Sequence, residues 1–232
     1  MPRKNARKIY VKDGIYHIYN RGVEKRIIFL EDNDYKYFLK LLKESLSAPQ
    51  IPPKINFTVT LKGDTFKGIA KQPKNFSDKI LLLAYCLMPN HFHLLIKQTN
   101  DTAIKDFMQS ISTRYSMYFN KKYNRVGSLF QSVYRAILVS EENYFLHLSR
   151  YIHRNPSEFQ NNLSQTYSSY ADYINLRNTP WLDKSIILSY FNNNKANIIN
   201  IPTHINSYQS FVEAKEIESE KFLGKTILED LS

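Results

Sequence analysis

Two histidines one residue apart are the first candidates for chemistry in this 232-residue sequence. His91-Phe92-His93 leads into apolar residues as far as Ile96, which is typical of a strand. Side chains alternate along a strand, so both imidazoles point to one face, roughly 7 Å apart. Two imidazoles in this position can bind one divalent metal. The pattern alone does not separate a metal site from two histidines packed in a core.

A predicted helix supplies the second set of candidates. Its first turn contains Glu141 and Glu142, which favours Ser140 as the N-cap, and Pro156 ends it. His147, Tyr151 and Asn155 follow at intervals of four residues and form one polar column.

Next to the histidine strand, this column would offer a phenol nucleophile, Tyr151, and an amide oxygen as a third metal ligand, Asn155. A phenol has an ordinary pKa near 10, so it needs nearby positive charge to attack at neutral pH. The alternative is that Tyr151 is an ordinary half-buried helix tyrosine. Tyr144 and Tyr134 are the next candidates for the nucleophile.

The charge indicates a polyanionic partner, either nucleic acid or an anionic membrane. The net charge is +11, and residues 1–160 hold 26 Lys and Arg against 13 Asp and Glu. No apolar run is long enough for a membrane span, the N-terminus lacks a signal-peptide core, and one cysteine excludes an internal disulfide. We therefore expect a cytoplasmic protein with no membrane partner.

Basic residues interleaved with tyrosines favour binding to unpaired nucleic acid. If at least two of them are exposed, the predicted stacking residues are Tyr115, Tyr118, Tyr123 and Tyr134. The predicted phosphate-binding residues are Arg3, Lys4, Arg7, Lys8, Arg21, Arg114, Lys121, Lys122, Arg125 and Arg135. A solvated helix face and tyrosines packed in the core are the structural alternatives.

The remaining pattern alternates strands and helices. Strands are predicted at 15–19, 55–61, 65–69, 80–88 and 91–97, and before Val139, with Gly63-Asp64 as a turn. Helices are predicted at 34–46 and 102–122, and in the tail from about 207.

Several motifs together resemble the single-tyrosine HUH transposases, and most closely the branch associated with repetitive extragenic palindromes (REP). The motifs are YHIYNRG (16–22), YCLMPNHFHLLI (85–96), GSLFQ (127–131), RYIHRNP (150–156) and SSY (168–170). The resemblance covers about residues 10–175. The loop or hairpin at about 49–76 is an insertion relative to shorter members, and 176–232 forms an extension of unknown role.

The resemblance implies an α+β fold, with a ferredoxin-like antiparallel sheet carrying helices, followed by a mostly helical C-terminal extension. It implies His91 and His93 as the metal pair, Asn155 as third ligand and Tyr151 as nucleophile. The metal would be Mg²⁺ or Mn²⁺, and imidazole ligands favour Mn²⁺. The implied reaction nicks and rejoins single-stranded or hairpin DNA through a 5′-phosphotyrosine, in a monomer or homodimer.

Two other functions fit parts of the sequence. A domesticated relative would bind hairpin DNA without cutting it, although all the predicted active-site residues are present. A metal-dependent phosphoesterase would use the histidine pair, but no carboxylate-rich cluster accompanies it. Neither alternative forms a covalent protein–DNA adduct.

Overall fold

The computed structural model describes residues 8–49, 56–69, 74–192, 201–202, 204–215, 217, 219 and 223. Its centre is a βαββαβ unit. In chain order this unit consists of β1 (Ile15–Arg21), α1 (Asp32–Leu46), β4 (Ile80–Met88), β5 (His91–Gln98), α2 (Ala103–Lys122) and β6 (Arg135–Val139).

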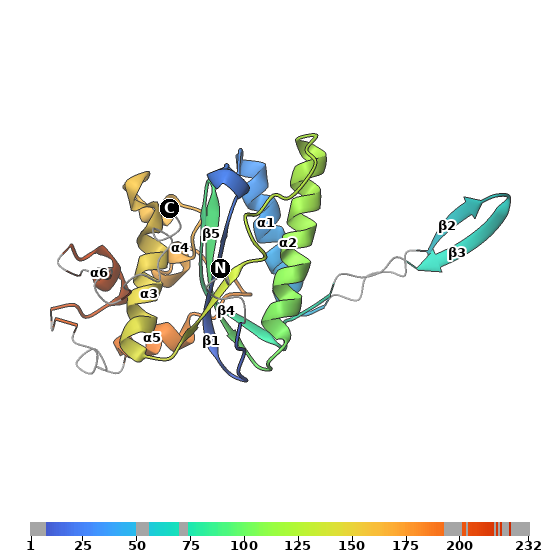
Figure 1. Cartoon of the computed structure of the whole chain (residues 1–232). Helices are drawn as coiled ribbons and strands as arrows, with labels where there is room; N and C mark the ends of the chain where they lie inside the picture. Colours follow the sequence, from blue (N-terminus) through green and yellow to red (C-terminus); the bar gives the residue numbers. More distant parts are fainter. Residues whose placement is uncertain are drawn as a thin grey trace, which may run out of the picture.

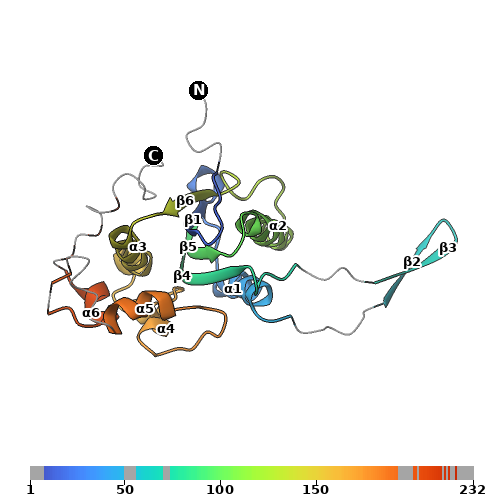
Figure 2. The same cartoon turned by 90° about the horizontal axis from the view of Figure 1, so that it is seen from below.

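The four main strands form one antiparallel sheet in the order β4-β5-β1-β6 (Figures 1 and 2). This connectivity confirms the predicted ferredoxin-like arrangement. Both central strands, β5 and β1, are almost wholly buried, because helices cover both faces of the sheet. A register shift between Leu82 and Ala84 interrupts the β4–β5 ladder.

Helices α1 and α2 cover one face of the sheet, and α3 (Glu142–Arg154) lies on the other (Figures 1 and 2). Phe92, Leu94 and Ile96 of β5 point into the core shared with α1 and α2. Leu95 belongs to the second core, which contains the apolar residues of α3. The period-two alternation of β5 therefore separates an apolar face from the face that carries the histidines.

Helix α3 begins and ends close to its predicted limits. Its N-cap is Glu141 rather than the predicted Ser140, and no side-chain hydrogen bond caps it. The strand β6 ends at Val139, so Ser140 lies in the short connection between strand and helix. After Arg154 the chain tightens into a 3-10 helix, Asn155–Glu158, which contains Pro156.

The C-terminal segment packs on α3. Three short helices belong to this part of the chain, α4 (Tyr170–Tyr173), α5 (Ser185–Asn192) and α6 (Tyr208–Glu213). Ile187 of α5 and Phe211 of α6 share a core with Ile152 of α3. The side chain of Arg150 on α3 is buried and donates hydrogen bonds to the carbonyls of Phe211 and Ala214. The predicted extension therefore helps to fix the position of α3.

The predicted hairpin between α1 and β4 is present as β2 (Asn56–Leu61) and β3 (Asp64–Ile69). It stands away from the rest of the molecule (Figures 1 and 2). Its turn is Lys62-Gly63, both with positive φ, and not the predicted Gly63-Asp64. Asp64 instead pairs with Leu61 in the ladder, which matches the preference of two-residue hairpin turns for left-handed backbone.

Two further 3-10 turns, Val23–Lys25 and Leu163–Gln165, complete the elements. Within the described ranges, no helix has the length and apolar character needed to cross a membrane.

Candidate active site

Both candidate histidines lie near the start of β5, on the face of the sheet covered by α3. Their ring centroids are 5.0 Å apart, with His93 fully buried and His91 partly accessible. The predicted common face is confirmed. The short Pro89-Asn90 turn before His91 is fixed by Gly22, whose N–H donates to the Asn90 carbonyl at 2.9 Å. A Cβ at Gly22 would lie 2.3 Å from the Arg26 carbonyl oxygen, so only glycine fits this close approach.

The end of α3 brings Tyr151 and Asn155 to the histidines. Asn155 Oδ1 lies 3.1 Å from His91 Nε2. The ring of Tyr151 meets the ring of His93 edge to face, with centroids 5.6 Å apart. The four residues predicted to form the site are thus brought together, although 60 positions separate His91 from Tyr151 in the sequence.

His147, the first member of the predicted polar column, lies elsewhere. Its ring packs against Phe211, and its Nδ1 is 3.2 Å from Ser219 Oγ in the C-terminal segment. Two helical turns separate His147 from Asn155 by roughly 12 Å along the axis, and each step of four residues rotates the side chain by roughly 40°. The column therefore turns away from the sheet at His147, which lies outside the candidate site.

Hydrogen bonds assign the tautomer of His91. Asn90 Nδ2 donates to the Lys25 carbonyl at 3.3 Å, so Asn90 Oδ1 is the atom that accepts from His91 Nδ1 at 2.6 Å. His91 Nε2 then carries a lone pair, and it faces a second acceptor, Asn155 Oδ1. Burial lowers the pKa of His91 to about 4, opposed in part by the contact with Asn155 and helped by the charge of Arg21, so the ring is neutral at pH 7.

His93 is oriented by a third histidine. His17 Nε2 on β1 lies 2.8 Å from His93 Nδ1, and both rings are fully buried. Among the described residues, His93 Nε2 has no hydrogen-bond partner. Burial lowers the pKa of His17 to about 3 and holds the pKa of His93 well below its usual range. Sequence reasoning missed His17, although its place in a buried strand of alternating pattern was a signal.

These donors fit a divalent metal. His91 Nε2 and Asn155 Oδ1 are two acceptors facing each other, and two ligands about 2.1 Å from one ion at a right angle lie about 3 Å apart. His93 Nε2 is a buried acceptor without a partner in the described part of the chain. Within those residues there is no group of three His, Cys, Asp or Glu side chains that could hold a metal. A metal at this place would depend on two imidazoles and one amide.

A cavity of about 400 Å³ opens beside these side chains. It is lined by Arg21, Ile27, Met88, Pro89, Asn90, His91, Tyr151, Asn155, Glu158 and Phe159. A larger cavity of about 860 Å³ lies between α2 and the loop 127–134, but none of the four candidate residues lines it. The smaller cavity combines a phenol, an imidazole, an amide and a guanidinium, so it is the candidate site for the chemistry.

The other predicted phosphate-binding residues are dispersed. Lys122 pairs with Glu31 and the buried Asp34, both at 2.6 Å, and Arg114 pairs with Glu44. These carboxylates neutralise the two charges locally. Arg125 donates to Asn120 Oδ1 at 2.8 Å.

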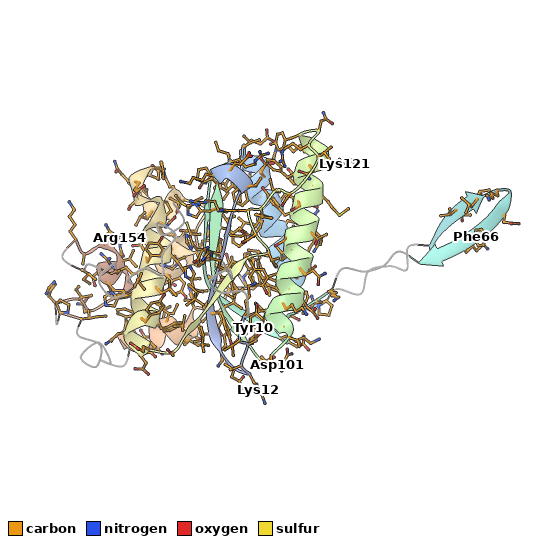
Figure 3. The ribbon with its side chains drawn as sticks, viewed as in Figure 1. Tyr10, Lys12, Phe66, Asp101, Lys121 and Arg154 are labelled. Atoms are coloured by element: carbon orange, nitrogen blue, oxygen red, sulfur yellow. The ribbon has the colours of Figure 1, made fainter. Side chains whose placement is uncertain are left out.

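Of the remaining basic candidates, Lys121 is exposed at the end of α2 (Figure 3), and Arg135 is partly exposed on β6. Lys8 lies 4.5 Å above the ring of Tyr134. Arg3, Lys4 and Arg7 lie outside the described residues.

The predicted stacking residues are largely used in packing. Tyr115 is fully buried and donates to the Ile28 carbonyl at 2.5 Å, and Tyr134 is also buried, so neither can stack on a base. Tyr118 is half-buried and stacks on Tyr37 with centroids 3.8 Å apart. Tyr123 is half-buried and donates to Asp34. The condition of exposure therefore fails for two of the four: the stripe of α2 that carries Tyr115 faces the core, and Tyr134 packs in the same core from outside that helix.

Comparison with known proteins supports the resemblance. Residues 63–155, less than half of the chain, match the family model described as Transposase IS200 like, and this segment contains His91, His93, Tyr151 and Asn155. No curated protein matches the sequence.

Two solved structures are similar. One is a REP-associated tyrosine transposase bound to a REP hairpin, at 12% identity and TM-score 0.47, covering 79% of this chain and 93% of that chain. The other is a protein from Deinococcus radiodurans R1 assigned as a transposase, at 14% identity and TM-score 0.36, covering 66% of this chain and 97% of that chain.

Proposed function

We propose, from the match of residues 63–155 to the IS200-like transposases, that this protein is a DNA strand transferase whose nucleophile is Tyr151. The observation that carries the proposal is the meeting of Tyr151 with His91, His93 and Asn155 beside one cavity. A phenol and three neutral metal donors at one site are suited to attack on a phosphodiester.

The reaction balances without an external energy source. The Tyr151 oxygen bonds to the scissile phosphorus as its proton leaves, and the bond from phosphorus to the 3′ oxygen breaks. The departing strand takes up a proton and ends in a 3′-hydroxyl, while the other strand is held as a 5′-phosphotyrosine. Attack on this linkage by another 3′-hydroxyl releases the phenol and joins two DNA strands. The number of phosphodiester-type bonds is unchanged in both steps.

His91, His93 and Asn155 would hold Mg²⁺ or Mn²⁺. When bound, such an ion polarises a non-bridging phosphate oxygen and offsets the charge that develops there. Asn90 supports this role, since its contact leaves the lone pair of His91 Nε2 available, and His17 would do the same for His93 Nε2 by accepting from His93 Nδ1.

Arg21 would bind the phosphate within the same cavity. It pairs with His91 in the β1–β5 ladder and lines the same cavity as Tyr151. A guanidinium suits a phosphate because its planar donors match two oxygens at once.

Single-stranded or hairpin-borne DNA is the substrate that suits this site. His93 is fully buried behind the cavity, so a phosphate must enter between the sheet and α3 to reach the phenol. An unpaired backbone bends into such a recess more easily than a duplex does. The excess of Lys and Arg in residues 1–160 supports a polyanionic ligand.

Trapping the covalent intermediate tests the proposal. A single-stranded oligonucleotide library labelled at the 3′ end is incubated with the protein and Mn²⁺, then separated under denaturing conditions. We expect labelled DNA to migrate with the protein, and Tyr151→Phe to abolish the adduct. Cleavage without an adduct would indicate a hydrolase, and binding without cleavage would indicate a DNA-binding protein. Either result overturns the proposal.

A further inference from the structure

The β2–β3 hairpin projects from the rest of the molecule and carries two lysines, Lys62 and Lys67, against one acidic residue. Residues 54–74 contain five lysines and a single acidic residue, Asp64. Lys62 at the turn and Lys67 on β3 are both exposed. The hairpin extends away from the sheet and the helices, so its charge lies outside the candidate active site (Figures 1 and 2).

The ladder gives the hairpin two unlike faces. Thr58 pairs with Lys67 and Thr60 with Thr65, which makes one face polar. On the other face Val59 pairs with Phe66. Leu61 lies on this second face as well.

The second face is open to solvent. The exposed fractions of the side chains are 46% for Val59, 63% for Leu61 and 57% for Phe66. Figure 3 labels Phe66, which lies on the hairpin away from the body of the protein.

A partner would stabilise this element. An isolated two-stranded hairpin is marginally stable in water. The net positive charge selects a polyanion over a neutral or basic protein surface. Six-residue strands are roughly 20 Å long, and a two-stranded ribbon fits the major groove of a DNA duplex.

We propose that the β2–β3 hairpin is a DNA-binding arm that contacts a double-stranded part of the substrate, outside the site of cleavage. Lys62 and Lys67 bind phosphates, and the threonine face lies toward the groove, where hydroxyls hydrogen-bond to base edges or phosphates. This inference deepens the proposed function, because it takes DNA as the substrate and adds a duplex contact to the single-stranded one.

The test compares two double variants that lose the same charge. Lys62→Gln/Lys67→Gln removes two charges from the hairpin. Lys12→Gln/Lys215→Gln removes two exposed charges from the body, and Figure 3 shows Lys12 below the sheet, well away from the hairpin. Binding is measured by fluorescence anisotropy on a stem-loop with a single-stranded flank and on the flank alone, at several salt concentrations. Circular dichroism checks that both variants fold.

We expect the hairpin variant to bind the stem-loop about tenfold more weakly at low salt, with a slope of log K against log salt smaller by about one to two. Its binding to the flank alone and its adduct formation on the flank should equal those of the wild type. The body variant should bind the stem-loop within about twofold of wild type.

Equal losses in both variants, or no loss in either, would overturn the proposal. A third variant, Val59→Ser/Phe66→Ser, tests whether the hairpin instead binds a second copy of the chain. If the wild type is a dimer and this variant alone is a monomer, the hairpin is a dimer contact and the proposal is overturned. The transferase activity and the DNA-binding role of the hairpin are refuted by different results. Absence of any adduct refutes the transferase, whereas the stem-loop comparison depends on binding alone.

Discussion

His17 Nε2 lies 2.8 Å from His93 Nδ1, and neither ring is accessible to solvent. The two histidines belong to neighbouring strands, β1 and β5, and their rings stack at 18° with centroids 5.1 Å apart. If His93 donates its Nδ1 proton to His17, its Nε2 lone pair points toward Tyr151 and His91. A partner of this kind fixes both the tautomer and the orientation of a metal-binding imidazole.

His17→Gln should therefore weaken metal binding without removing a ligand. We expect about 10- to 100-fold lower Mn²⁺ affinity, the range found when a hydrogen-bond partner of a liganding histidine is lost. Isothermal titration of Mn²⁺ measures the effect, with His204→Gln, at an exposed position, as the matched control. Unchanged affinity in His17→Gln would show that His93 needs no orienting partner.

Tyr151→Phe should abolish nicking and leave DNA binding within a few-fold of wild type. The change removes only the hydroxyl, so the edge-to-face packing on His93 remains. Gel assays of nicking and anisotropy of binding measure the two effects. Tyr144→Phe, on the same helix, is the control and should nick normally. Normal nicking by Tyr151→Phe would assign the nucleophile to another residue.

The three candidate ligands should differ in the size of their effects. His91→Ala and His93→Ala each remove an imidazole, so we expect loss of nicking and of Mn²⁺ binding. Asn155→Ala should be milder, since an amide oxygen is a weaker ligand and water can replace it. Nicking rates across an Mn²⁺ titration measure this order, and high Mn²⁺ should partly rescue Asn155→Ala. Full activity of either histidine variant at low Mn²⁺ would contradict the metal assignment.

The parts of the site that sequence reasoning predicted are local. Alternation along β5 fixes the common face of His91 and His93, and four-residue spacing at the end of α3 places its C-cap, Asn155, one turn beyond Tyr151. Each relationship is set within one element. The resemblance of the motifs supplied the further step, that the strand and the helix meet.

The contacts that were missed depend on register between distant segments. His17 and His93 are 76 residues apart in sequence, and no local pattern specifies that they pair diagonally across two strands. The position of His147 also depends on a distant segment, because its ring contacts Phe211 and Ser219 rather than the sheet. Tertiary packing, and not the local periodicity of the strand or the helix, determines the contacts of His17 and His147.

Acid should destabilise the folded protein, partly through His153 on α3. This residue is fully buried, and its two ring nitrogens lie 2.7 Å from Tyr208 Oη and from Ser169 Oγ. Burial, with a smaller contribution from Arg177, lowers the pKa of His153 to about 3, against a usual value of 6.5. Between these two values the unfolded chain binds a proton that the folded chain does not, so folding stability falls as the pH is lowered.

From pH 7 to pH 5 this linkage costs about 2 kcal/mol of stability for a histidine that stays neutral when folded. Urea denaturation at the two pH values measures the change. His153→Gln cannot titrate, so its free energy of unfolding should fall by about 2 kcal/mol less than that of the wild type over the same interval, even if the variant is less stable at pH 7. The buried His17 shifts in the same direction and leaves the variant with a residual dependence. Equal losses in the variant and the wild type would mean that His153 is protonated in the folded protein, contrary to the burial and the contacts with α6 and Ser169 seen here.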